Sequence, residues 1–95
     1  FLATGSCMTL FTIVDQTDLD TTIKKIKTQI ADCVPSPSKL RISVRDIVPH
    51  KNNHHIRFSI HINPFREDYI AAIISKVNRI EAVGGSEVFR DRIFS

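Results

Sequence analysis

Two alternating segments in the middle of the chain, residues 40–45 and 55–62, are the clearest feature of its hydrophobic pattern. In both segments apolar side chains stand at even positions and polar or basic side chains at odd positions. Side chains two residues apart on a strand share a face, so each segment predicts a strand with one apolar face and one polar face. The polar turn at residues 50–53 joins them, which predicts an antiparallel hairpin.

The odd positions of this hairpin carry most of its cationic side chains. If both strands keep their register, these side chains lie on one surface, whereas Phe58 and the other even positions enter the core. We call this surface the basic face, and it consists of Arg41, Arg45, His55, Arg57 and His61. The alternation fails after Val44, because Asp46 falls on an apolar position. We therefore expect a bulge or bend near residues 45–47.

The flanking segments predict two more strands and two helices. Residues 9–14 are β-branched and aromatic and predict a first strand, and residues 87–89 predict a short last strand after a turn at residues 82–85. Apolar residues recur at helical spacing in two other segments. The first stripe consists of Leu19, Ile23, Ile26, Ile30 and Cys33, and the second of Ile70, Ile73, Ile74, Val77 and Ile80.

Capping residues indicate where the helices begin and end. Thr17, with Asp20 three positions later, approximates a capping box for the first helix, and the Pro-Ser-Pro run at residues 35–37 ends it. Asn63 and Pro64 suit the cap and first turn of the second helix.

The resulting order is strand, helix, strand, strand, helix, strand. Right-handed crossovers would place both helices on one face of a four-stranded antiparallel sheet, which is the α+β ferredoxin-like sandwich. The basic face is then the open side of the sheet. A chain of 95 residues forms one domain. We assign residues 9–90 to it, residues 1–8 to a tag or linker remnant, and residues 91–95 to a frayed end.

Composition narrows the class of protein. The chain is 42% hydrophobic and 24% charged, as in ordinary globular domains. A net charge of +3 permits an anionic partner but is low for a dedicated nucleic-acid binder. Two cysteines do not form a disulfide framework, which favours the cytoplasm, and no window of 18 apolar residues predicts a membrane span.

The histidines are weak candidates for a metal site. His54 and His55 are neighbours and point to opposite faces, and His55 and His61 lie about 20 Å apart along an extended strand. A zinc site needs three or four convergent ligands, so only His50, His54 and His55 near the turn stay as candidates for a divalent-metal sensor. Cys7 lacks the second thiolate that soft-metal transfer needs. We expect no cofactor.

No arrangement of residues points to catalysis. The acids Asp15, Asp18, Asp20, Glu67 and Asp68 gather at helix starts, where the helix dipole favours them anyway. Gly84 and Gly85 predict a turn and not a phosphate loop, because no helix start with a lysine follows them. We therefore expect that the chain is not an enzyme.

Nucleic-acid binding is an alternative that the sequence leaves open. RNA-binding domains of this topology stack bases on aromatic side chains of the central strands. The outward positions of the second hairpin strand carry no such aromatic, and Phe58 faces inward. Contacts from Arg41, Arg45 and Arg57 to phosphate are still compatible with the pattern, so an anion- or RNA-binding module is the second hypothesis.

Two families have this order of elements. ACT domains usually carry a glycine in the loop after the first strand, where a small ligand approaches the backbone, but residues 14–19 contain none. We therefore expect no small-molecule ligand at that loop. The chain also resembles the C-terminal domain of the MgtC/SapB family through residues 9–14, the hairpin, and the ending at residues 77–88. That resemblance implies the cytoplasmic domain of a membrane protein linked to magnesium homeostasis and virulence.

The first hypothesis is therefore a non-catalytic regulatory or interaction module. We expect it to contact a second copy, as a homodimer, or its parent membrane protein, through a sheet edge or the basic face.

Overall fold

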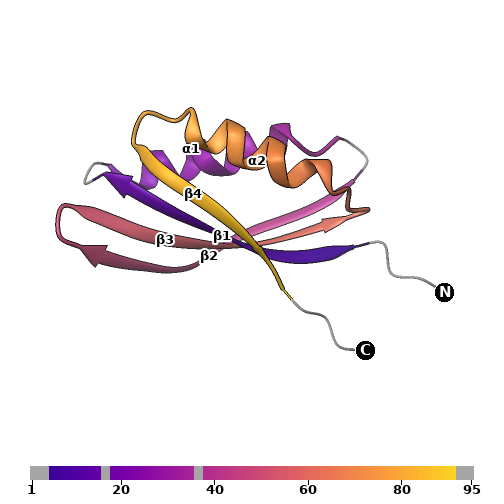
Figure 1. Ribbon diagram of the computed structural model, residues 1–95, viewed down its shortest axis with the longest axis horizontal. Coiled ribbons are helices and arrows are strands. Elements are labelled where there is room, and N and C mark those ends of the chain that lie inside the picture. Colours follow the sequence, from indigo (N-terminus) through magenta and orange to yellow (C-terminus); the bar gives the residue numbers. More distant parts are fainter. Residues whose placement is uncertain (1–4, 16–17, 36–37, 92–95) are drawn as a thin grey trace.

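Four strands form one antiparallel sheet in the order β2-β3-β1-β4, and two helices lie side by side over one of its faces (Figure 1). The computed structural model describes residues 5–15, 18–35 and 38–91. The elements are β1 (Ser6–Asp15), α1 (Leu19–Asp32), β2 (Lys39–His50), β3 (Asn53–Asn63), α2 (Asp68–Asn78) and β4 (Val83–Arg90). This arrangement confirms the ferredoxin-like βαββαβ sandwich.

The core lies between the helices and the inner face of the sheet. Phe58, Ile60 and Ile62 of β3 are completely buried there, as the even positions of the hairpin predicted, and Met8 and Leu10 of β1 are buried beside them. The helices contribute the buried side chains Ile26, Ile30, Tyr69, Ile73 and Val77. The odd positions of β3 point to the other side of the sheet, which has no covering layer among the described residues.

The expected bulge is present in β2. Val44 is paired with Phe58, but the next pair joins Asp46 to Arg57, so Arg45 is an extra residue. A bulge of this kind directs two successive side chains to the same side of the sheet. Arg45 and Asp46 thus both reach the open face, and the alternation of β2 is reversed beyond them.

The hairpin turn is shorter than predicted. His50 is paired with Asn53, which leaves only Lys51 and Asn52 in the turn. Lys51 has a φ of 55°, in the left-handed region that two-residue hairpin turns require and that side chains other than glycine adopt at some cost.

The domain extends beyond both of its predicted ends. β1 begins at Ser6, which is paired with Ile62, so residues 6–8 belong to the sheet and not to a linker. At the other end, the backbone N–H of Asp91 donates to the carbonyl of Cys7, so Asp91 continues the ladder. Residues 1–4 and 92–95 lie outside the described residues.

The cap of α1 is Asp18. Its carboxylate accepts hydrogen bonds from the backbone N–H and the hydroxyl of Thr21. Thr17, the predicted cap, lies outside the described residues. An Asp cap satisfies an otherwise unpaired N–H in the first turn, which explains why the helix begins here.

Two other predicted boundaries are wrong. α2 begins at Asp68, because β3 runs to Asn63, paired with Lys39, and a four-residue connection follows. β4 begins at Val83, so Gly84 and Gly85 lie in the strand and not in a turn. Gly84 is the extra residue of a second irregularity, since Ile13 is paired with Gly85 and Val14 with Val83.

We expect Ile60→Val to lower the free energy of unfolding by about 0.5–1.5 kcal/mol, because it removes a methylene group from a completely buried side chain. Ile47→Val is the matched control: Ile47 lies on β2 beyond the bulge and is 39% exposed, so its loss is expected to stay within about 0.5 kcal/mol. Urea titration of both variants measures the difference. Equal losses would contradict the layer assignment.

Candidate functional site: the open face of the sheet

Strand pairing arranges the outward side chains in rows across the sheet. One row contains Asp46 of β2, Arg57 of β3, Phe11 of β1 and Glu87 of β4. The row nearer the hairpin turn contains Val48, His55, Ile13 and Gly85. The row on the other side contains Ser43, Ser59, Thr9 and Phe89. The open face therefore contains apolar side chains of β1, β2 and β4 in addition to the five residues of the basic face.

A depression of about 490 Å³, which we call the trough, lies over the centre of these rows. Its lining residues are Thr9, Phe11, Arg45, Asp46, Val48, His55, Arg57 and Phe89. The volume falls within the range of roughly 300–1,000 Å³ that small-molecule and cofactor sites occupy. All four strands contribute to the lining, which combines apolar rings with a few cationic donors.

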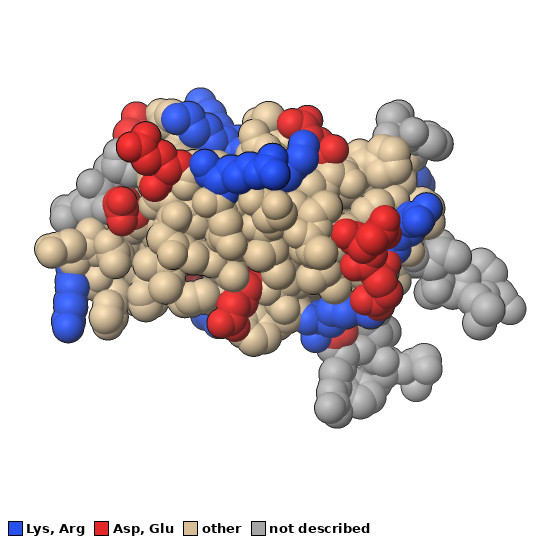
Figure 2. All heavy atoms as spheres, turned by 45° about the horizontal axis from the view of Figure 1, so that its top comes forward, with Lys and Arg blue, Asp and Glu red and all other residues tan. Residues whose placement is uncertain are grey.

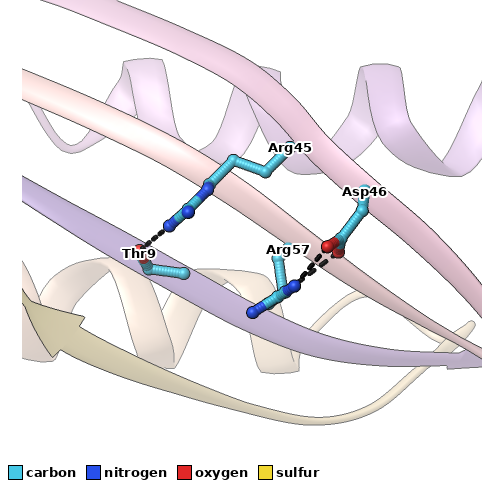
Figure 3. Close-up of polar contacts among 4 residues, drawn as sticks. All are labelled: Thr9, Arg45, Asp46 and Arg57. Atoms are coloured by element: carbon cyan, nitrogen blue, oxygen red, sulfur yellow. Dashed lines mark hydrogen bonds and ion pairs between the residues drawn. The ribbon is translucent and has the colours of Figure 1, made fainter.

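Arg57 and Asp46 form an ion pair at one side of the trough (Figure 3). Arg57 Nε donates to Asp46 Oδ1 at 2.9 Å, and Arg57 Nη2 contacts the other carboxylate oxygen. This hydrogen bonding holds the pKa of Asp46 below, and that of Arg57 above, the ordinary values. Because the two side chains are 47% and 35% exposed, water screens the pair and it adds little to stability.

Arg45 reaches across the sheet in a different way. Its guanidinium passes over β3, and Nη1 donates to the hydroxyl of Thr9 on β1 at 3.1 Å (Figure 3). Arg45 forms no ion pair within the part of the chain that the structure describes. The bulge therefore places beside the trough a cation that forms no direct salt bridge among the described residues, although its charge acts on Asp46 and the Thr9 hydroxyl that it contacts donates to Asp91 at 3.4 Å.

Aromatic rings from all four strands approach the same region. The rings of His50 and His55 are stacked, with centroids 4.8 Å apart, and the ring of Phe11 meets His55 edge-on at 5.2 Å. Phe89 also lines the trough and is 53% exposed. Sequence reasoning examined only β3 for outward aromatics and so missed Phe11 and Phe89.

The structure divides the predicted basic face into two parts. Arg45, His55 and Arg57 line the trough, whereas Arg41 and His61 are paired with each other in a row farther from the hairpin turn. All five positions lie on the open side, but the trough unites only three of them. Their role in binding stays a prediction.

The metal candidates are not brought together. His50 and His55 stack on the open side, but His54 points to the helix side, where its Nδ1 is buried without a hydrogen-bond partner. Among residues 5–15, 18–35 and 38–91, no group of three or more histidine, cysteine or acidic side chains is close enough to hold a metal ion.

The other perturbed groups have structural causes. The hydrogen bonds from Thr21 lower the pKa of Asp18, and burial raises the pKa of the Cys33 thiol. Cys33 and Cys7 are both free thiols. At the far end of β4, Arg90 pairs with Glu67 and lies over the ring of Phe65 at 4.7 Å.

A second depression, of about 400 Å³, lies beside the N-terminus of α1 and includes Asp15, Asp18 and Ala82. It adjoins the loop at which ACT domains bind ligands. Residues 16–17 of that loop lie outside the described residues, so the expectation of no ligand there stays a prediction.

Comparison with known proteins shows the fold. The chain is similar to the C-terminal domain of the MgtC protein from Mycobacterium tuberculosis, with a TM-score of 0.63 and 9% identity over 93% of this chain and 89% of that one. It is also similar to the de novo designed proteins Foldit4, with a TM-score of 0.57 and 10% identity over 95% and 99% of the chains, and Ferredog-Diesel, with 0.54 and 18% over 97% and 90%.

No family model and no curated protein sequence matches the chain. The resemblance to the MgtC C-terminal domain that the sequence predicted is thus confirmed as a likeness of fold. Neither helix of the described residues is long and apolar enough to cross a bilayer.

We expect the stability difference between the wild type and Asp46→Asn to depend on pH. A carboxylate whose pKa is lowered in the folded state contributes stability above its ordinary value of 3.8, and loses that contribution as the pH falls toward the folded-state pKa. The wild type should therefore be the more stable protein at neutral pH, and the two should converge below pH 3.8. Thermal unfolding at a series of pH values measures this convergence.

Glu87→Gln is the control for this experiment, because Glu87 is on the same face and has no ion pair among the described residues. A pH-dependent difference as large for Glu87→Gln as for Asp46→Asn would show that the Arg57 contact is not its source.

Proposed function

We propose that the chain is a non-catalytic regulatory or interaction module that associates with a second copy of itself through the free edge of β4. The observation that carries this proposal is Phe89, a large apolar side chain that is 53% exposed on an edge strand. A second β4 strand paired with the first would continue the sheet and bring two Phe89 side chains near each other on the open face.

The two edges of the sheet differ in how well they are protected from pairing. Natural edge strands avoid association by means of charged residues, proline and bulges. The β2 edge has all three, in Arg41, the bulge at Arg45, and Pro49. β4 has a bulge at Gly84 and a charge at Arg90, but residues 85–89 between them carry only one charge, that of Glu87, and neither a proline nor a bulge. The β4 edge is therefore the one open to a partner.

The hydrogen-bond pattern identifies the backbone groups available on this edge. Asp91 donates to Cys7, which makes the odd residues of β4 the ones that exchange hydrogen bonds with β1. The N–H and C=O groups of Ser86, Val88 and Arg90 consequently point away from the sheet. These are the groups that a second β4 strand would satisfy.

The non-catalytic part of the proposal is supported by the perturbed side chains. Asp18 caps a helix, Asp46 and Arg57 bind each other, and Cys33 is shifted by burial in the stripe of α1. Each perturbation has a structural cause that needs no reaction to explain it. The fold shared with the MgtC C-terminal domain supports a regulatory domain attached to a membrane-bound parent protein.

We expect Val88→Pro to abolish self-association, because proline removes one outward N–H and leaves the ladder to β1 intact. Val88→Ala is the matched control, since it loses similar packing and keeps the N–H. Light scattering after size exclusion should give a dimer mass for the wild type and Val88→Ala and a monomer mass for Val88→Pro, with circular dichroism verifying the fold of each. A wild type that stays monomeric at its highest soluble concentration would overturn the proposal.

A further inference from the structure

We propose that the open face binds a short segment of single-stranded nucleic acid, with bases stacked on the exposed rings and phosphates at Arg45 and Arg57. This binding activity goes beyond the self-association proposed above and does not require it, although Phe89 belongs to both surfaces. β4 pairing would use the sheet edge, whereas nucleic acid would occupy the trough.

The rings of the open face provide a stacking surface that crosses the sheet. His50 of β2 stacks on His55 of β3, which in turn contacts Phe11 of β1. Phe89 of β4 stands diagonally to Phe11, one row away, with half of its surface exposed. Base stacking on aromatic side chains is favourable for any base, because every base has a π-face.

The two central arginines lie beside this line of rings. Arg45 crosses over β3 to Thr9, and Arg57 is the direct neighbour of Phe11 on the adjacent strand. A guanidinium next to a ring can meet a phosphate whose base stacks on that ring, or can stack on a base itself. The side of the molecule that bears the helices carries charges of both signs (Figure 2), and its cations Lys25, Lys76 and Arg79 lie beside Glu81 in a depression without an aromatic ring in the lining.

Asp46 sets the strength of this site. Its carboxylate occupies the donors of Arg57, so a phosphate must compete with it for that guanidinium. Glu87 adds a second negative charge in the same row. The face therefore has few cations available for phosphate, which predicts weak, salt-sensitive binding and a specific effect of removing Asp46.

The shape of the surface favours a single strand over a duplex. An exposed sheet can contact bases that are unstacked from their neighbours, whereas the bases of a duplex are enclosed in its grooves. Beyond the trough, Arg41 and His61 continue the polar side chains along the sheet, which gives a chain of nucleotides more contacts than one nucleotide has.

The test uses fluorescence anisotropy with labelled eight-nucleotide oligo-U and oligo-A, a duplex of the same length, and a mononucleotide as competitor. We expect both single strands to bind at low salt, with an affinity that falls as salt rises, and the duplex and the mononucleotide to bind at least ten-fold more weakly. No detectable binding of either oligomer at low salt would overturn the proposal, and so would equal affinity for the mononucleotide.

Substitutions at Arg45 and Phe89 locate the site. Arg45→Ala should weaken binding and reduce the salt slope by about 0.7, the value for one lost phosphate contact on a single strand. Lys25→Ala, which removes the same charge from the exposed side of α1, is the control and should leave the slope unchanged. Phe89→Leu, which keeps an apolar side chain but no ring, should weaken binding by about five-fold or more.

The most specific result expected concerns Asp46. Asp46→Asn should bind the oligomers several-fold more tightly, because it frees Arg57, whereas Asp20→Asn on α1 changes the net charge equally and should have little effect. Equal gains for the two variants would show that only net charge matters and would overturn the site. The Val88→Pro variant should bind as the wild type does, so a failure of self-association and a failure of nucleic-acid binding are distinguishable.

Discussion

The structure depends on burying one face of a four-stranded sheet under two helices. The completely buried side chains of β1 and β3, with those of α1 and α2, form a single layer, and strand alternation then directs the intervening residues to the opposite side. Since the described residues form only two helices, they leave that opposite side uncovered. The trough, the ring contacts and the ion pair all lie there as a consequence of this one packing constraint.

The bulge at Arg45 changes which side chains of β2 reach the open face. Without the extra residue, Asp46 would be directed to the core side of β2, where a carboxylate would have to be desolvated. With it, Arg45 and Asp46 share the open face, and Asp46 reaches Arg57 in the same row. The bulge also directs Ile47 to the helix side, near the end of the hairpin, where it stays partly exposed.

The sequence was sufficient for the order of elements, the hairpin, the parity of β3 and the bulge, because each follows from a local pattern. The start of α2 was not predictable in this way, since Asn63-Pro64 suits the end of a strand as well as the cap of a helix. The length of β4 was also missed. Glycine is uncommon in strands, but the edge of β1 pairs Ile13 with Gly85 and Val14 with Val83, and a local sequence pattern does not reveal this pairing.

The candidate site was predicted only in part, and β1 shows why. Phe11 and Ile13 face outward, whereas Thr12 faces the core, where its hydroxyl donates to the carbonyl of Ile56 at 3.0 Å. Hydrophobicity alone would assign these residues the other way round. The buried hydroxyl is acceptable because its hydrogen bond satisfies it, and the outward-facing, half-buried ring of Phe11 contacts His55. Cross-strand pairing, and not residue polarity, thus determines which side each β1 residue occupies, and it turns a face predicted to be basic into one that combines rings with arginines.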